Sequence, residues 1–493
     1  MGSDTTNTQR WLFLAIISVG LFLVGADNSI LYTALPTLER ELSATALEGL
    51  WMINAYPLVL CGLLLGTGTL GDRIGHRLMF LIGVLVFGLA SFFAAFASNA
   101  WLLIAARACL GVGAATMMPA SLALIQITFL NEQQRNTAIG IWGSVGAVGA
   151  ATGPLLGGLL LQNFWWGSVF LINVPVAIGV FFATIAIAPA NVANPSRHWD
   201  LPSSLYAMLA MVGAVMLIKE TAHNHRQLWV IVVSLLATIL GGWAFSSRQK
   251  KLTTPLLSLD IFRNRMFSGG VLTAGAAMFC LSGIELTTTQ RFQLIGGYTP
   301  LEAGLLVALV ALSCVPASVL GGANLHRIGF LPLISGGFVL LASGLGLALW
   351  AFQDNHQFWF FLALVAVGLG AGSVMSVSST AIIGSAPPSK AGMASAVEAV
   401  SYEFGTLLAV AILGSLTPLF YRLFAPPELS EPYASDPRSA AAYDTGYFVI
   451  IALVIIVALI AAIITAWCFR TNPKRAYVPE GVLLCDAASG KKF

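Results

Sequence analysis

Fourteen long apolar runs decide what this chain can fold into. A helix needs about 20 mostly apolar residues to cross a bilayer, and each run approaches or exceeds that length. Because the runs are continuous, they do not fit the strands of an outer-membrane barrel, in which apolar and polar residues alternate. The expected spans are 11–35, 51–70, 78–97, 101–129, 138–161, 169–189, 202–218, 228–246, 267–288, 303–323, 332–352, 358–383, 394–420 and 445–469.

Charged residues are scarce. Only 9% of the chain is Asp, Glu, Lys or Arg, whereas a soluble domain carries about 25%. With 57% apolar residues, the composition excludes a soluble globular enzyme and a disordered chain. The net charge of +3 gives no reason to expect a nucleic-acid partner. The sequence therefore predicts an all-α polytopic membrane protein.

The basic residues indicate how the spans are oriented. Seventeen of the 24 Lys and Arg residues fall in one set of connections, six fall in the other, and Arg107 lies inside a span. An even number of spans puts both termini on the same side, and the excess of basic residues marks the cytoplasmic side. We therefore expect both termini in the cytoplasm.

A weak internal duplication indicates two halves. Residues 71–75 read Gly-Asp-Arg-Ile-Gly after the second span, and residues 325–329 read Leu-His-Arg-Ile-Gly after the tenth. This register predicts an N-terminal six-helix bundle over 1–190, two inserted transmembrane helices over 191–250, a C-terminal six-helix bundle over 251–475 and a cytoplasmic tail over 476–493. Two halves around a site near the midplane are typical of secondary transporters.

Ionisable residues at membrane depth are costly and are the first candidates for function. Asp27 and Glu403 lie well inside their spans. An apolar environment penalises the charged carboxylate, so such a group can bind a proton in one state and a cation in another. For Asp27, the alternative is a packing acid held by a hidden arginine.

Three further charged residues leave alternatives open. Glu285 can line a cavity, gate its outer mouth or pair with Arg291. Glu398 is five residues before Glu403, an offset of about 140° around a helix, and is either functional or interfacial. Arg107 either balances a carboxylate and takes part in coupling, or makes a purely structural pair.

Other residues are weaker candidates. Six aromatic, amide or Met side chains can line a pocket through their π faces or polar atoms, although plain helix packing explains each equally well: Tyr32, Trp51, Asn54, Tyr56, Met117 and Trp142. Gly153 and Pro154 belong to a glycine-rich span and indicate a tight hinge between helices.

The chain shows no phosphate-binding loop of the G-x-x-x-x-G-K-[ST] type and no H-E-x-x-H motif. We therefore expect no enzymatic activity, no cofactor and no metal, and we do not expect ATP to drive this chain directly. We expect a monomer in the lipid bilayer whose partners are small molecules and protons.

Several motifs resemble those of the major facilitator superfamily, and more narrowly its fourteen-span drug–proton antiporter branch. They are the loop signature over 68–77, Arg107 with the glycines that follow it, the antiporter motif over 149–158, the segment from Asp27 to Pro36, and the segment 170–175. The resemblance implies a role for Arg107 in proton coupling and for Asp72 and Arg73 in a cytoplasmic latch.

The surroundings of Glu403 and Glu285 resemble those in pumps for quaternary ammonium biocides and methyl viologen. The resemblance implies a bacterial inner-membrane antiporter that confers drug resistance by exporting dyes, biocides and other lipophilic cations. Asp27 and Glu403 would bind cation or proton in competition, with Glu285 and Glu398 as secondary acids. The alternative is a proton-coupled transporter of a neutral or anionic metabolite. An anion would require a basic cavity, yet the charged candidates at membrane depth are four acids and one arginine, Arg107.

Overall fold

The computed structural model describes residues 7–195, 199–222, 227–252, 255–354, 356–386, 391–426 and 436–470. Over these ranges the chain is helical and contains no strand. Fourteen helical segments are long and apolar enough to cross a membrane, which confirms the fourteen spans expected from the apolar runs. Arg197, Arg226, Lys390 and the expected tail over 476–493 lie outside the described residues.

The first seven helices supply six spans, because α6 and α7 together make the sixth. They are α1 (Asn7–Glu41), α2 (Ala46–Ile74), α3 (His76–Ala95), α4 (Ala100–Thr128), α5 (Glu132–Asn163), α6 (Ser168–Leu171) and α7 (Asn173–Ile187). Two further helices follow, α8 (Leu201–Ala222) and α9 (Leu228–Lys251). The remaining elements are η1 (Leu259–Arg263), α10 (Arg265–Leu294), α11 (Pro300–Ile328), α12 (Phe330–Gln353), α13 (Gln357–Gly384), α14 (Ala391–Phe424) and α15 (Pro437–Phe469).

Helices α2 and α11 begin and end in the same way. Each begins with a capping box, formed by Thr45 with Glu48 in α2 and by Thr299 with Glu302 in α11; such a box satisfies two of the free backbone N–H groups at a helix start. Each ends at a glycine with positive φ, 94° at Gly75 and 87° at Gly329, a conformation that side chains disfavour. The local signals therefore match the duplication expected from the Arg-Ile-Gly repeat.

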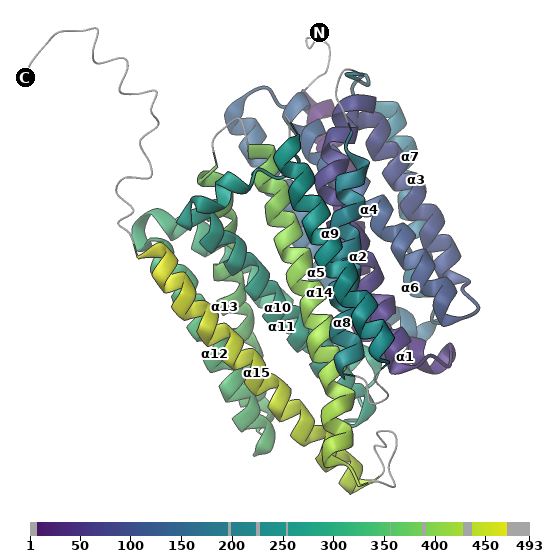
Figure 1. Cartoon of the computed structure of the whole chain (residues 1–493), viewed down its shortest axis with the longest axis vertical. Helices are drawn as coiled ribbons and strands as arrows, with labels where there is room; N and C mark the ends of the chain where they lie inside the picture. Colours follow the sequence, from purple (N-terminus) through teal and green to yellow (C-terminus); the bar gives the residue numbers. More distant parts are fainter. Residues whose placement is uncertain are drawn as a thin grey trace, which may run out of the picture.

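The helices gather into two groups with separate cores. In the first group α1 packs against α5, and α4 packs against α2 and α3; in the second, α13 packs against α11 and α12, and α14 packs against α10. Figure 1 shows α3, α6 and α7 on one side and α12, α13 and α15 on the other. The two groups meet along α5–α11 and α2–α14, with a smaller contact between α1 and α10.

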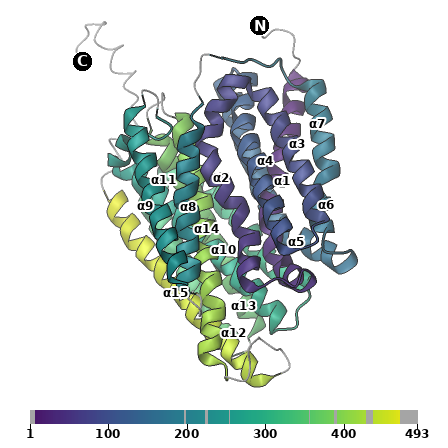
Figure 2. The same cartoon turned by 45° about the vertical axis from the view of Figure 1, so that its right-hand side comes forward.

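The inserted helices lie at the seam between the two groups. Helix α8 packs against both α2 and α14, and α9 packs against α8 (Figure 2). Helix α8 continues to Ala222, so Lys219, which the sequence placed in a connection, lies inside the helix. Its side chain is 3% exposed, and its Nζ sits 4.2 Å from the ring centroid of Trp51.

The two groups approach most closely where α1 ends, and we call this the Glu41 end of the bundle; the opposite end is the Asn7 end. A β-carbon on Gly304 of α11 would overlap the Pro154 carbonyl of α5, and one on Gly158 would overlap the backbone of Leu301. Toward the Asn7 end, by contrast, Gly140 and Gly143 of α5 face open space. The contact between α5 and α11 is therefore tight at the Glu41 end.

Replacing Gly304 by Leu should separate α5 from α11 at the Glu41 end, because the new side chain has no room beside Pro154. Spin labels placed at the Glu41 ends of these two helices should report a longer distance in Gly304→Leu than in the wild type. Gly346→Leu is the matched control, because a β-carbon at Gly346 meets no atom within 4 Å. An unchanged distance in folded Gly304→Leu protein would show that this contact does not hold the halves together.

Candidate functional site

A fully buried ion pair lies within the first group of helices. Arg107 Nη1 of α4 donates to Asp27 Oδ2 of α1, and both side chains are 0% exposed. Burying two charges costs free energy that the pair recovers only when its remaining hydrogen-bonding positions are also filled. The arrangement of the neighbouring polar groups therefore decides whether the pair is stable.

The neighbours of the pair come from two other helices, α2 and α7. Asn173 Nδ2 of α7 donates to Asp27 Oδ1 at 2.8 Å. Arg107 Nε donates to the Met52 carbonyl of α2 at 3.1 Å, and its guanidinium lies 4.6 Å from the ring centroid of Tyr56. One charged network thus joins α1, α2, α4 and α7.

The sequence left open whether Asp27 is a free acid or is held by an arginine, and the structure places it against Arg107. Its part in proton transfer stays a prediction. Sequence reasoning missed Asn173 as a partner, although Asn173 belongs to the segment 170–175 that carried part of the family resemblance. Its position as the first residue of α7, after the short α6, was the available signal.

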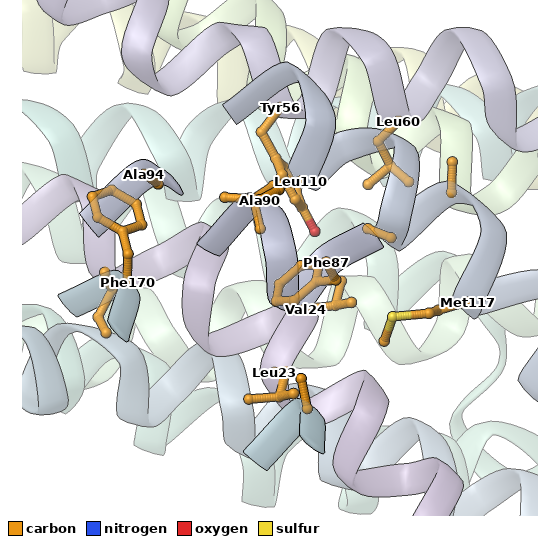
Figure 3. Packing of buried hydrophobic residues seen from close by; sticks show 14 of the residues in the cluster. Leu23, Val24, Tyr56, Leu60, Phe87, Ala90, Ala94, Leu110, Met117 and Phe170 are labelled. Carbon is orange, nitrogen blue, oxygen red and sulfur yellow. The ribbon is translucent and has the colours of Figure 1, made fainter. Parts of the chain in front are cut away.

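Apolar side chains surround the polar network. Figure 3 shows Tyr56 beside Leu110 and Ala90, with Phe87 next to them, and all four are at most 5% exposed. Met117 also lies in this core, where it is 2% exposed and packs near Gly20 of α1 and Gly83 of α3. Packing explains the position of Met117, whereas Tyr56 directly faces the buried charge.

Several buried polar atoms near the ion pair have no hydrogen-bond partner among the described residues. They include Arg107 Nη2, the Tyr56 hydroxyl and Glu403 Oε2, together with both amide atoms of Asn54. Buried polar atoms are nearly always paired with protein or with water. Unpaired atoms of this kind mark a place for water or for a ligand.

Glu403 of α14 and Glu285 of α10 bring negative charge from the second group of helices. Neither carboxylate makes a hydrogen bond or an ion pair within the part of the chain that the structure describes. Glu403 lies within electrostatic range of Arg107, and Tyr32 of α1 lies within range of both acids. Electrostatic contacts therefore connect the ion pair of the first group with the two acids of the second. We call these groups together the central polar region: Asp27, Arg107, Tyr32, Tyr56, Glu285 and Glu403.

The pairing of Glu285 with Arg291, one of the three alternatives, is not formed. Arg291 instead binds Asp444 of α15 through two hydrogen bonds, Nε–Oδ1 at 2.8 Å and Nη2–Oδ2 at 3.1 Å. Glu285 is thus left without a basic partner, and the alternatives in which it lines a cavity or gates its mouth remain.

Glu398 lies apart from Glu403. It accepts hydrogen bonds from the Tyr402 hydroxyl at 3.3 Å and from Ser379 of α13. The Tyr402 hydroxyl also bonds to the Met375 carbonyl of α13. The offset of five residues therefore turns Glu398 toward α13, where it has partners.

The remaining candidates lie outside the polar region. Trp51 packs against α8 beside Lys219, and Trp142 Nε1 donates to Ser121 Oγ at 3.1 Å. A β-carbon on Gly153 would overlap Ser29 of α1, so Gly153 and Pro154 lie where α5 passes closest to α1 and α11, as a tight contact between helices requires.

Asp72 and Arg73 are exposed at the end of α2. Asp72 Oδ1 lies 3.0 Å from His76 Nε2, and the Asp72 carbonyl accepts from the Asn194 backbone N–H. Within the described ranges, neither residue forms an ion pair with the second group of helices. A latch between the halves stays a prediction.

Comparison with known proteins gives one family. A sequence model of the Major Facilitator Superfamily matches residues 17–289 and 266–483. The methyl viologen resistance protein SmvA of Salmonella typhimurium is 38% identical over 410 residues, covering 83% of this chain and 82% of that protein. The multidrug efflux pump LfrA of Mycolicibacterium smegmatis is 34% identical over 422 residues, covering 85% and 82%.

Among solved structures, a bacterial homologue of the human lysosomal transporter Spinster, in an inward-facing and unoccupied conformation, has a TM-score of 0.68. The match covers 96% of this chain and 100% of that one at 16% identity. At this identity the likeness concerns the fold alone.

Replacing Arg107 by Met should destabilise the protein by about 3–5 kcal/mol, because it leaves the Asp27 carboxylate buried and unpaired. The double variant Asp27→Asn/Arg107→Met should recover part of this loss, since neither side chain of the buried pair is then charged. Thermal unfolding of the purified protein measures both. Arg438→Met is the control: its side chain is 64% exposed, so the midpoint should stay near that of the wild type. A double variant no more stable than Arg107→Met would contradict the electrostatic account.

Proposed function

The chain belongs to the major facilitator superfamily, and from this premise we propose that it is a proton-coupled antiporter that exports lipophilic and quaternary ammonium cations. Relatives named for methyl viologen resistance and multidrug efflux support this substrate class. The chain is a multi-pass membrane protein. Its excess of basic residues in one set of connections supports a cytoplasmic location for both termini, in the cytoplasmic membrane of a bacterium.

One observation carries the proposal: Glu285 and Glu403 are carboxylates at membrane depth, and neither forms an ion pair with a basic residue in the part of the chain that the structure describes. A carboxylate without a partner is stable there only if it is protonated or if a cation lies beside it. Protons and organic cations therefore compete for the same two groups. That competition is the simplest physical basis for exchanging one for the other.

The Arg107–Asp27 pair gives a second route for coupling. While Asp27 is ionised, it balances the charge of Arg107. A proton on Asp27 leaves Arg107 unbalanced, and its positive charge then acts on the nearby Glu403. The field of Arg107 weakens the binding of a cation at Glu403, so protonation of Asp27 favours release of the substrate.

Alternating access follows from the same arrangement. The tight contacts at the Glu41 end, including Thr289 Oγ1 to the Tyr32 carbonyl at 3.1 Å and Gln293 Nε2 to the Thr33 carbonyl at 2.9 Å, would close the periplasmic side. The open space along α5 toward the Asn7 end would then admit a substrate from the cytoplasm. On this reading the structure represents the inward-open state, and rocking of the two halves would reverse it.

The balance of charge in the polar region favours cations over the alternative of an anionic metabolite. The single arginine there is already paired with Asp27, so an anion would meet two free carboxylates and no free base. If more than one proton enters per monovalent cation exported, the membrane potential adds to the driving free energy of transport. The addition is about 2.3 kcal/mol for each net charge moved across 100 mV. That term would allow the substrate to be concentrated outside.

The direct test is the change of pH inside proteoliposomes when ethidium, methyl viologen or benzalkonium is added. The wild type should move protons in response to at least one of them. Glu403→Gln should lower apparent affinity at least tenfold, since a charged contact is worth about 1.5–3 kcal/mol and 1.4 kcal/mol is tenfold. Absence of a pH response to all three compounds would refute cation–proton exchange.

Glu398→Gln is the matched control for Glu403→Gln. It makes the same chemical change on the same helix, but at a carboxylate that already has two hydrogen-bond partners, Tyr402 of α14 and Ser379 of α13. We expect its proton response to stay close to that of the wild type. Equal losses in the two variants would show that the unpaired state of Glu403 is not what matters.

A further inference from the structure

A second cavity lies in the C-terminal group of helices, away from the central polar region. It is a half-open cavity of about 550 Å³ lined by residues of α10, α11, α12, α13 and α15 near the Glu41 end. Binding sites for small molecules commonly measure roughly 300–1,000 Å³. Asp27, Glu285 and Glu403 are not among the residues that line it, so the transport mechanism proposed above does not account for this cavity.

Six of the thirteen residues that line the cavity are aromatic. They converge from four helices and one connection: Phe292, Tyr298, Phe352, Phe360, Phe361 and Phe448. Their centroids are close, for example 4.9 Å between Phe292 and Tyr298, 5.5 Å between Phe292 and Phe360, and 5.6 Å between Phe352 and Phe448. Phe361 is 44% exposed, so the wall also reaches the surface that faces lipid.

The cavity already holds one cation against its rings. The guanidinium of Arg291 lies 4.3 Å from the centroid of Phe352 and 5.0 Å from that of Phe292. Its charge is balanced by Asp444, which accepts through both oxygens. Arg291 and Asp444 are the charged residues among those that line the cavity, and their charges cancel.

We propose that this cavity is a second binding site, which takes a bulky aromatic cation with a delocalised charge. The negative faces of aromatic rings attract cations, most strongly where water is excluded. The single carboxylate is already paired, so a small, strongly hydrated cation would lose its water without compensation. A large cation with spread charge loses little hydration and gains contact with the rings.

The position of the cavity links it to the contact that closes the Glu41 end. Arg291 and Phe292 form part of its wall, while Thr289 and Gln293 of the same helix hydrogen-bond to the backbone of α1. If the proposed function holds, the Glu41 end is the exit side. A cation at this second site would then lie beside the closing contact, on the path of release.

Equilibrium dialysis of tetraphenylphosphonium against the full-length protein in lipid nanodiscs tests the proposal. The wild type should bind about two cations per chain. Phe352→Leu/Phe360→Leu keeps the wall apolar but removes ring faces, and it should weaken one of the two sites roughly tenfold. Glu285→Gln/Glu403→Gln should retain that site. Phe93→Leu, which changes a ring that is 66% exposed on α3, should bind as the wild type does.

A neutral compound of similar shape, triphenylphosphine oxide, should not displace the cation from the second site. Equal displacement by the neutral compound, or a single wild-type site that disappears in the double Glu variant, would overturn the proposal. If the Phe variant does not fold, a photoreactive aryl phosphonium should label segments 291–298 and 351–361 of the wild type. Labelling confined to other segments would also overturn it.

The two proposals fail in different ways. A missing proton response with two intact binding sites would refute the antiport function and leave the second site standing. A normal proton response, with one binding site that disappears in Glu285→Gln/Glu403→Gln, would refute the second site alone.

Discussion

The structure depends on how one buried positive charge is neutralised. Arg107 lies inside the apolar N-terminal bundle, where an unpaired charge would cost several kcal/mol, and Asp27 supplies the opposite charge. Their remaining hydrogen-bonding positions draw in Asn173 of α7 and the backbone of α2 at Met52. This requirement fixes the relative positions of four helices and gives the N-terminal half an internally balanced charge.

The two halves therefore differ in the charged groups that they bring to the central polar region. Asp27 is already paired in the N-terminal half. Near this pair, the acids that have no hydrogen-bond or ion-pair partner among the described residues are Glu285 and Glu403 of the C-terminal half. Tyr32 and Tyr56 each lie within electrostatic range of Arg107 and of Glu403. The N-terminal half thus holds a paired acid and base, while the C-terminal half contributes the two carboxylates for which, in the function proposed above, protons and cations compete. The inserted helix α8 covers the seam by packing on both halves.

The sequence predicted features that depend on local pattern. Run length determined the fourteen spans, and the repeat over 71–75 and 325–329 indicated the matching roles of α2 and α11. It could not predict which charges pair, because partners are chosen by helix packing: Arg107 and Asp27 are 80 residues apart, and Arg291 and Asp444 are 153 apart. For the same reason Lys219, near the end of an apolar run, was placed in a connection, although packing against α2 buries it.

The central claim is that protons and cations compete for the same buried carboxylates. Calorimetry of tetraphenylphosphonium binding to the purified protein, repeated in buffers of different ionisation enthalpy, counts the protons released per bound cation. The account predicts net proton release in the wild type near neutral pH, and less release in Glu403→Gln. Binding with no proton release, or with the same release after Glu403→Gln, would contradict it.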